Sequence, residues 1–304
     1  MKIKKKIVMV TGVAGFIGSK LANRLILEGY TVVGIDNLSS GKIKNIPKGV
    51  KFLKIDLSKN KQLIKITKNI KYIFHLAGQS SGEISYYDPL GDLEKNTLST
   101  INLIEYGIKN NSKAIYFASS MSVYGNNKKK FFSENDLCKP LSNYGNSKLI
   151  SEHYLKIYSK QLPYVNFRMF NVYGPGQDMS NLKQGMLSIY LAQALKNKRI
   201  IVKGSINRRR DFIYIDDVID CWLLAFKKKI KNISINIASG KSVSVKDLLK
   251  NIRKNLPGTY YKVSKGTPGD QFNVSANISL LKKNLGKKNF TSLSSGLKNF
   301  IDLI

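Results

Sequence analysis

Cysteine and histidine are scarce in this chain. Its 304 residues include two of each. The cysteines, Cys138 and Cys221, are far apart, lie in no CxxC pattern and have no histidine at ligand spacing. This pattern excludes a small disulfide scaffold and a zinc site, and it favours a reducing compartment. We therefore expect no metal.

Long apolar runs are missing as well. A membrane-spanning helix needs about 18 uninterrupted apolar residues, and the sequence contains no such run. The apolar run Ile7–Val10 breaks at once into Thr-Gly, which makes it too short for a signal peptide. We expect a cytoplasmic protein with no membrane partner.

Acidic residues are few. The sequence has 19 Asp and Glu against 51 Lys and Arg, which gives a formal net charge of +32. Such a charge suggests a polyanionic partner. However, the charge is almost all lysine in short runs, and no run is interleaved with the stacking aromatics of a nucleic-acid groove. We interpret these lysines as a solvated surface, and we expect no nucleic-acid partner.

Short apolar runs alternate with amphipathic stretches in the first half of the chain. Residues 6–12 and 72–78 have the composition of buried parallel strands, and residues 19–29 that of a helix. This alternation predicts an α/β fold with a doubly wound parallel sheet of the Rossmann type. Gly174, Pro175 and Gly176 interrupt this alternation of strands and helices. We therefore predict a dinucleotide-binding domain over residues 1–171, to which the chain returns around 211–240, and a smaller substrate-binding domain mainly over 172–304.

A glycine-rich segment follows the first predicted strand. Gly12 allows a tight turn, Gly15 lets the backbone approach a pyrophosphate at a helix N-terminus, and Gly18 lets helix and strand pack closely. Phe16 and Ile17 lie between the last two glycines. The segment predicts a dinucleotide site formed by these five residues.

An acidic residue ends the second predicted strand. Asp36 lies 18 residues after Gly18, where a carboxylate accepts hydrogen bonds from the adenosine ribose hydroxyls and repels a 2′-phosphate. Asn37 follows at a position where an NADP enzyme tends to carry Arg or Lys. We predict that the cofactor is NAD.

Tyr144 and Lys148 are four residues apart and share one face of a predicted helix. An ammonium beside a phenol lowers the phenol pKa from about 10 toward neutrality, which would make Tyr144 a general base. Neither histidine is expected to be the base, because His75 lies in a predicted strand and His153 is about 180° round the helix from Tyr144.

These segments together resemble the extended short-chain dehydrogenase/reductases. The motifs are TGxxGxxG at 11–18, Asp36 after the second strand, SSxSVYG at 119–125, YxxxK at 144–148 and RxFNVYGPGQ at 168–177. They point to the NAD-dependent nucleotide-sugar epimerase/dehydratase group, similar to the UDP-glucose 4-epimerases. The resemblance implies that Ser120, Tyr144 and Lys148 are catalytic. Ser120 would bond the reacting oxygen, and Lys148 would also bond the nicotinamide ribose.

Met121 and Ser122 indicate the type of reaction. The family's 4,6-dehydratases carry an Asp-Glu pair at these two positions, its UDP-glucuronate decarboxylases a Glu at the second, and its keto-sugar epimerase-reductases a Cys at the second. Without such a group, the simplest reaction is oxidation at a sugar carbon, rotation of the keto sugar and reduction on its other face. We predict a UDP-hexose 4-epimerase.

The resemblance also assigns the remaining contacts. Asp56, Leu57, Ala77 and Asn96 would hold the cofactor, together with Tyr144 and Lys148. The nucleotide-sugar contacts would be Gln79, Ser80, Ser122, Asn171, Arg210, Asp270 and Val274. Arg210 would bind the pyrophosphate, whereas Thr267 stands where the family usually has a second Arg. A bulky Tyr at the Val274 position excludes N-acetyl sugars in the family, so Val predicts tolerance of them.

Several alternatives stay open at this point. The enzyme could be a UDP-N-acetylhexosamine or UDP-glucuronate 4-epimerase, a CDP-sugar 2-epimerase or a keto-sugar reductase. A non-enzymatic NAD- or RNA-binding protein on a Rossmann scaffold is a further alternative. The resemblance also implies a homodimer through the segments 92–109 and 144–160, which carry apolar residues on more than one face.

Overall fold

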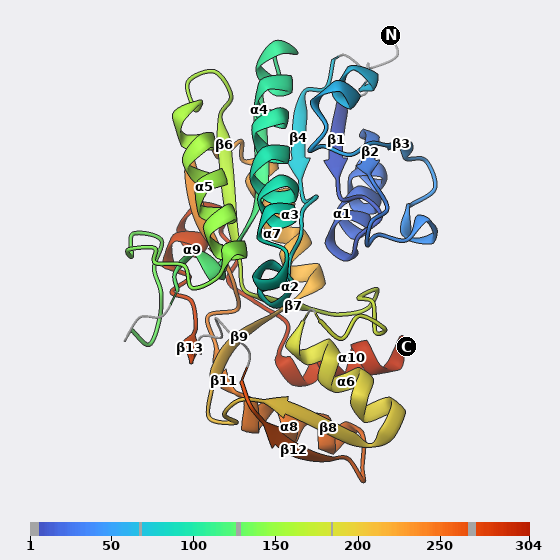
Figure 1. The fold of residues 1–304 in the computed structure, drawn as a ribbon, viewed down its shortest axis with the longest axis vertical. Coiled ribbons are helices and arrows are strands. Elements are labelled where there is room, and N and C mark those ends of the chain that lie inside the picture. Colours follow the sequence, from blue (N-terminus) through green and yellow to red (C-terminus); the bar gives the residue numbers. More distant parts are fainter. Residues whose placement is uncertain (1–5, 67–68, 126–128, 184, 267–271) are drawn as a thin grey trace.

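A computed structural model describes residues 6–66, 69–125, 129–183, 185–266 and 272–304. Figure 1 shows a larger α/β region with a smaller region of helices and short strands below it. No helix in the described ranges has the length and apolarity needed to cross a bilayer.

The larger region is built on a seven-stranded parallel sheet in the order β10-β6-β5-β4-β1-β2-β3. Its strands are β1 (Ile7–Thr11), β2 (Thr31–Asp36), β3 (Lys51–Lys54), β4 (Tyr72–His75), β5 (Ala114–Ser120), β6 (Tyr164–Met169) and β10 (Ile233–Ile237). The predicted fold class, an α/β doubly wound sheet, is confirmed. The strand order reverses between β1 and β4, and such a reversal places a crevice at the carboxyl ends of the strands.

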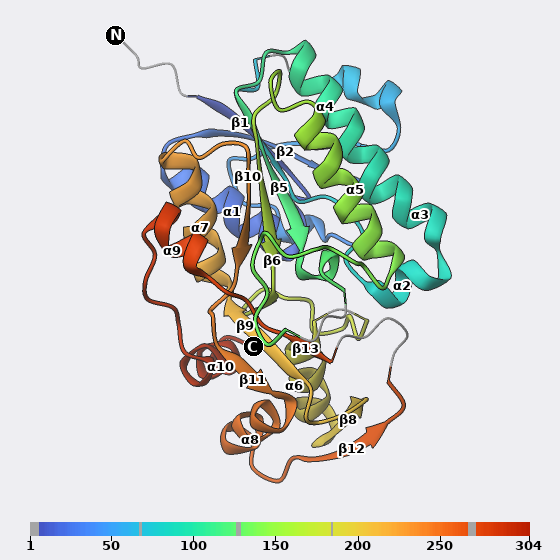
Figure 2. The same ribbon diagram turned by 90° about the vertical axis from the view of Figure 1, so that its left-hand side faces the viewer.

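Helices cover both faces of this sheet (Figure 2). One face carries α1 (Phe16–Leu27), α7 (Ile215–Lys227) and α9 (Ser279–Leu285), and the other carries α4 (Ser99–Lys109) and α5 (Asn143–Ile157). Because both faces are covered, every residue of β5 is buried. β3 is an exception to the prediction of doubly buried strands: it lies at the sheet edge, and Lys51 and Lys54 are exposed.

Short helical segments join the strands near the crevice. They are η1 (Ile43–Asn45), η2 (Asn60–Lys65), η4 (Met121–Val123), α2 (Gly82–Tyr87) and α3 (Pro89–Leu93), followed by the π-helical turn η3 (Glu94–Leu98), which leads into α4. Both α2 and α3 pack against α5. This packing places their polar side chains next to the helix that carries Tyr144.

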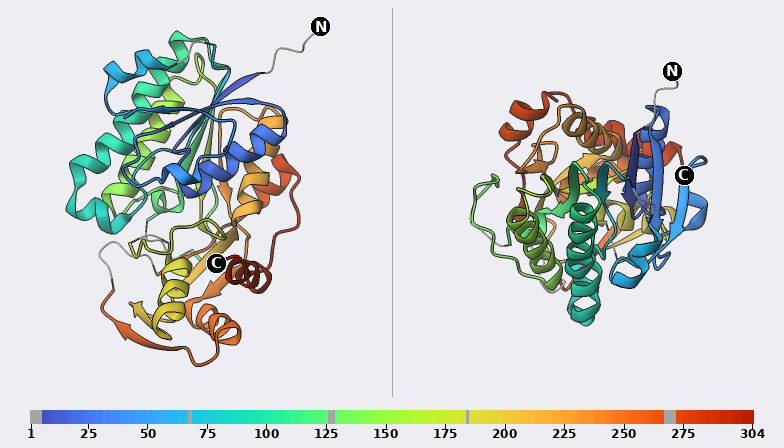
Figure 3. Two further views of the ribbon diagram at one scale, coloured as in Figure 1. Left: turned by 90° about the vertical axis from the view of Figure 1, so that its right-hand side faces the viewer. Right: turned by 90° about the horizontal axis from the view of Figure 1, so that it is seen from above.

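The smaller region contains β7 (Asn171–Tyr173), β8 (Arg199–Lys203), β9 (Arg209–Tyr214), β11 (Ser242–Ser244), β12 (Tyr260–Ser264) and β13 (Asn273–Val274), with α6 (Met186–Asn197), α8 (Val245–Asn255) and α10 (Leu293–Asp302). β9 pairs with β7, β11 and β13. After β9 the chain forms α7 and then β10, which pairs with β6 in the large sheet (Figures 2 and 3). Thus β9 belongs to the smaller sheet, although its residues 211–214 fall within the segment predicted to return to the first domain.

Candidate active site

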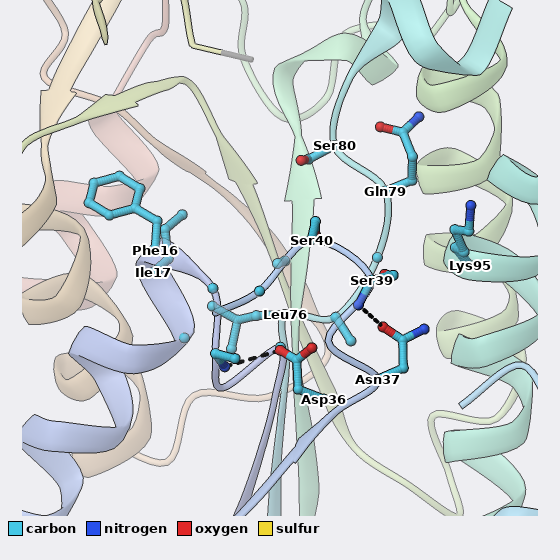
Figure 4. Close-up of a pocket in the computed structure, with 18 of the residues that line it drawn as sticks. Phe16, Ile17, Asp36, Asn37, Ser39, Ser40, Leu76, Gln79, Ser80 and Lys95 are labelled. Carbon is cyan, nitrogen blue, oxygen red and sulfur yellow. Dashed lines mark hydrogen bonds between the residues drawn. The ribbon is translucent and has the colours of Figure 1, made fainter. Parts of the chain in front are cut away.

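A cleft of about 420 Å³ lies at the carboxyl ends of β1, β2, β3 and β4. Figure 4 shows part of its lining. The structure brings most of the predicted cofactor residues together there, along with two predicted substrate residues. The predicted residues in the lining are Gly12, Gly15, Phe16, Ile17, Gly18, Asp36, Asn37, Asp56, Leu57, Ala77, Gln79, Ser80, Tyr144 and Lys148.

The glycine loop depends on close backbone contacts. Gly12 has φ +68°, a conformation that side chains disfavour, and a Cβ on Gly18 would lie 2.1 Å from the Gly12 carbonyl oxygen. In the part of the chain that is described, no side chain caps α1 at Gly15, and its first turn holds no acidic residue. The free N–H groups of α1 therefore face the cleft as an anion site.

Asp36 is buried at the end of β2 (Figure 4). Its Oδ2 accepts a hydrogen bond from the Ala14 amide at 3.0 Å, and its Oδ1 accepts one from the Leu38 amide at 2.8 Å. A carboxylate oxygen has two acceptor sites, so each oxygen keeps one for a ribose hydroxyl. Asn37 donates to Asp56 Oδ2 at 3.4 Å and thereby joins the loops after β2 and β3.

A segment from beyond β7 also lines the cleft, and the sequence did not predict it. Gly176, Gln177, Asp178 and Asn181 face the loop after β2, and Asp178 forms an ion pair with Lys42 at 2.8 Å. The hydrogen bond from Lys42 lowers the pKa of Asp178 to about 2. The other unpredicted lining residues near Asp36 include Ser39, Ser40 and Asn45. Gln177 lies in a motif already recognised in the sequence, but no local pattern places this segment over a distant loop.

The three predicted catalytic residues meet where β5 and α5 adjoin. Ser120 ends β5, where its hydroxyl donates to Ser122 Oγ at 3.2 Å and lies close enough to the Tyr144 phenol to act on its pKa. The Tyr144 amide donates to Ser85 Oγ at 3.1 Å, which fixes the start of α5. Lys148 is buried one turn later, with Nζ 5.8 Å from the centre of the Tyr144 ring and 4.9 Å from that of Phe117.

Burial has the largest effect on the pKa values of Tyr144 and Lys148. It raises the pKa of Tyr144 to about 12, although the hydrogen bond with Ser120 acts in the opposite direction. Burial also lowers the pKa of Lys148 to about 8. The expected lowering of the Tyr144 pKa toward neutrality is therefore not found for the chain by itself, because desolvation of the phenolate raises that pKa.

Asn96 lies beside this group but is not in the cleft lining. A Cβ added to Gly78 would lie 2.4 Å from Asn96 Oδ1 and 3.3 Å from Lys148 Nζ, so all three are close neighbours. His75 is fully buried, with Nδ1 2.9 Å from Thr11 Oγ1 and Nε2 3.0 Å from Thr100 Oγ1. Burial lowers the pKa of His75 to about 3. The prediction of a core histidine is confirmed.

Ser122, Asn171, Arg210 and Val274, the other predicted substrate residues that the structure describes, lie outside the cleft lining. Asn171 donates from Nδ2 to the Asp211 carbonyl at 2.9 Å and so joins β7 to β9. Arg210 is buried and donates to the carbonyls of Arg209 and Phe272. Burial, followed by repulsion from Arg208, lowers the pKa of Arg210 to about 10.

Val274 is fully buried and is the register partner of Arg210 across β13 and β9. The Ser122 amide donates to Ser120 Oγ at 3.1 Å in the turn after β5. Asp270 and Thr267 lie outside the described residues. The substrate roles of these residues stay predictions.

The chain belongs to the NAD dependent epimerase/dehydratase family, which matches residues 8–238. It is 34% identical over 300 residues to a putative UDP-glucose 4-epimerase of Methanocaldococcus jannaschii, with 97% of each chain covered. A UDP-glucose 4-epimerase of Thermotoga maritima, crystallised with UDP-glucose, has a TM-score of 0.93 at 32% identity over 98% of both chains. A UDP-N-acetylglucosamine 4-epimerase of Methanobrevibacter ruminantium, in complex with UDP-N-acetylmuramic acid, has a TM-score of 0.91 at 32% identity, covering 99% of this chain and 98% of that one.

The protein is thus an enzyme of the NAD-dependent nucleotide-sugar epimerase/dehydratase family, as the sequence motifs indicated. The residues present fit NAD: the uncapped start of α1 suits a pyrophosphate, the glycines allow close approach, and Asp36 keeps acceptor sites for ribose hydroxyls. The predicted cofactor is confirmed. The homodimer and the cytoplasmic location stay predictions.

Proposed function

We propose that the protein is a UDP-hexose 4-epimerase. The observation that carries this proposal is the group of Ser120, Tyr144 and Lys148, with Met121 and Ser122 directly after Ser120 where dehydratases and decarboxylases of the family have carboxylates. A dehydratase needs an acid or base at those positions to eliminate water. With a single proton-transferring tyrosine, oxidation and reduction at one carbon is the reaction that the group supports best.

The chain's residues would divide the chemistry as follows. Bound NAD supplies a hydride acceptor that later returns the hydride to the sugar. Tyr144 would take the proton from the C4 hydroxyl and give it back to the C4 oxygen after the keto sugar has turned over. Ser120 would donate a hydrogen bond to the same oxygen, and the Lys148 charge would favour the phenolate form of Tyr144.

The smaller region would hold the nucleotide. Arg210 carries a planar guanidinium that suits bidentate contacts with phosphate. It is buried on β9, the strand to which β7 and β13 attach Asn171 and Val274. A pyrophosphate bound there would hold the nucleotide while the keto sugar turns in front of Tyr144.

A product assay tests the proposal directly. The purified protein is incubated with UDP-glucose, UDP-galactose and their N-acetyl counterparts, together with GDP, CDP and dTDP sugars, and the products are resolved by NMR. We expect UDP-glucose and UDP-galactose to interconvert without added NAD, because a family epimerase retains its cofactor. Turnover that consumes stoichiometric reduced cofactor would instead identify a keto-sugar reductase.

We also propose that the enzyme is a homodimer through α4 and α5. The two helices pack side by side on one face of the sheet (Figure 2). Apolar side chains stay exposed on or next to them, namely Leu93, Leu98, Ile150 and Ile157. Pairing with a second copy would remove these side chains from water. Light scattering at micromolar concentration should give twice the monomer mass, and a monomer mass would contradict the proposal.

A further inference from the structure

Asp92 is a buried carboxylate beside the catalytic group, and the proposed reaction gives it no task. It lies on α3, where that helix packs against α5, and it is 1% exposed. Burial of a carboxylate is costly unless nearby groups compensate its charge. The groups that compensate this charge therefore indicate what the residue does.

Three neutral donors surround Asp92. Its Oδ1 accepts from Gln79 Nε2 at 2.8 Å and from Asn96 Nδ2 at 3.0 Å, while its Oδ2 accepts from Ser147 Oγ at 2.7 Å. Ser147 directly precedes Lys148 on α5, and Gln79 follows β4 in the cleft lining. One carboxylate thus joins the loop that faces the substrate to the helix that carries Tyr144.

Burial raises the pKa of Asp92, whereas its hydrogen bonds and the Lys148 charge act in the opposite direction. The Asp92 charge in turn acts to raise the pKa of Lys148. The other facing groups are Tyr144 on α5 and His75 on β4, which is neutral at physiological pH. Charged groups on the surrounding elements have partners elsewhere or are exposed. They are Glu83 with Lys203, Asp88 with Lys95, Glu94 with Lys59, Glu152 with Arg168, and the exposed Glu105, Lys109 and His153.

We propose that Asp92 is a positioning residue that provides the fixed counter-charge of Lys148 and holds the Gln79 loop against α5 through its hydrogen bonds. This inference rests on the proposed roles of Tyr144 and Lys148. In this arrangement Gln79, Asn96 and Ser147 solvate the carboxylate through hydrogen bonds, and the Lys148 ammonium is left for bonds to the cofactor.

The sign of the electrostatic effect follows from the charge. A nearby negative charge favours protonated forms, so Asp92 raises the pKa of both Lys148 and Tyr144. Activity needs a deprotonated Tyr144 and a protonated Lys148. Because the pKa of Lys148 lies below that of Tyr144, the acid limb of the pH–rate profile breaks near the Lys148 pKa and the basic limb near the Tyr144 pKa. Removal of the Asp92 charge should move both limbs to lower pH.

The test is Asp92→Asn, which keeps the shape of the side chain. The new Oδ1 can accept from Gln79 and Asn96, and the new amide can donate to Ser147 Oγ, so the number of hydrogen bonds is kept. We expect both limbs of the kcat profile to shift down by about one pH unit. The control is Ser147→Ala, which removes one hydrogen bond and keeps the charge, and whose limbs should stay in place.

If the limbs of the kcat–pH profile of Asp92→Asn coincide with those of the wild type, the proposal is overturned, even if kcat itself falls. If that variant does not fold, the wild-type protein still decides the matter. The Asp92 side-chain ¹³C signal should show an ionised carboxylate between pH 6 and 9, and a protonated carboxyl at pH 7 overturns the proposal. A second NMR titration gives the Lys148 pKa in the wild type and in the variant. Neither NMR measurement needs turnover. A failure of the proposed epimerase reaction is therefore distinguishable from a failure of this inference.

Discussion

The two sides of the active site are built in different ways. On the cofactor side, the glycine loop, Asp36 and Ala77 lie at or directly after strands of one parallel sheet, so their positions in the sequence fix their places at the cleft. On the proposed sugar side, Asn171, Arg210 and Val274 come from three short strands far apart in the chain. The comparison teaches that the places of these cofactor residues follow from the order of one sheet, whereas the proposed sugar site depends on how the smaller sheet assembles.

Tyr144→Phe should cause the largest loss and separate chemistry from binding on both sides. The variant keeps the ring and loses the proton acceptor, so we expect kcat to fall by more than about 10²-fold while NAD stays bound. Tyr158→Phe is the control, because Tyr158 ends the same helix on the surface. Turnover and the NAD content of the purified protein are measured. Near-normal turnover in Tyr144→Phe would rule out the mechanism.

Arg210→Lys should damage the sugar side alone. Lysine keeps the charge and loses the guanidinium fork, so we expect the KM for the UDP-sugar to rise by roughly 10-fold, in line with the loss of one charged hydrogen bond. NAD content should not change. Arg209→Lys is the control, because Arg209 bonds Ser242 within the same sheet. Equal KM changes in both variants would indicate a general loosening of β9.

Val274→Tyr tests sugar size. Val274 is fully buried, so the bulkier tyrosine ring should exclude an N-acetyl sugar and leave UDP-hexose turnover in place. Overpacking should also lower stability by about 1–3 kcal/mol. Val274→Ile is the control for a small change in volume. The two activities and the thermal midpoint are measured together, and an equal loss of both activities would show that Val274 does not border the sugar.

Lys42→Met should have the smallest effect and act on the cofactor side. The Lys42–Asp178 pair holds residues 176–181 against the loop after β2, but both side chains are more than a third exposed. Pairs of this kind contribute at most about 1 kcal/mol. We expect release of the reduced cofactor to become about two- to fivefold faster at low salt, as followed by its stopped-flow fluorescence. Lys44→Met, at an exposed neighbour, should change nothing.

The same contrast explains how much the sequence could predict. The glycine loop, Asp36 and the Tyr144 helix were predictable, because each is fixed by a strand end or a helical period. Asp178 and Asp92 were not, because their roles depend on partners that tertiary packing brings near: Lys42 in one case and Ser147 in the other. The pKa of Tyr144 was predicted in the wrong direction, since spacing shows a nearby lysine but not the extent of burial.

The position of β10 has a consequence for synthesis of the chain. β10 covers the edge of β6, yet the ribosome makes it only after β7, β8 and β9 of the smaller region (Figure 2). Until residues 233–237 emerge, the backbone groups along one side of β6 have no neighbouring strand. A nascent chain, or a fragment ending before residue 233, thus carries an open edge that can pair with other chains. Release of this protein from the ribosome in folded form therefore depends on a strand that is translated late.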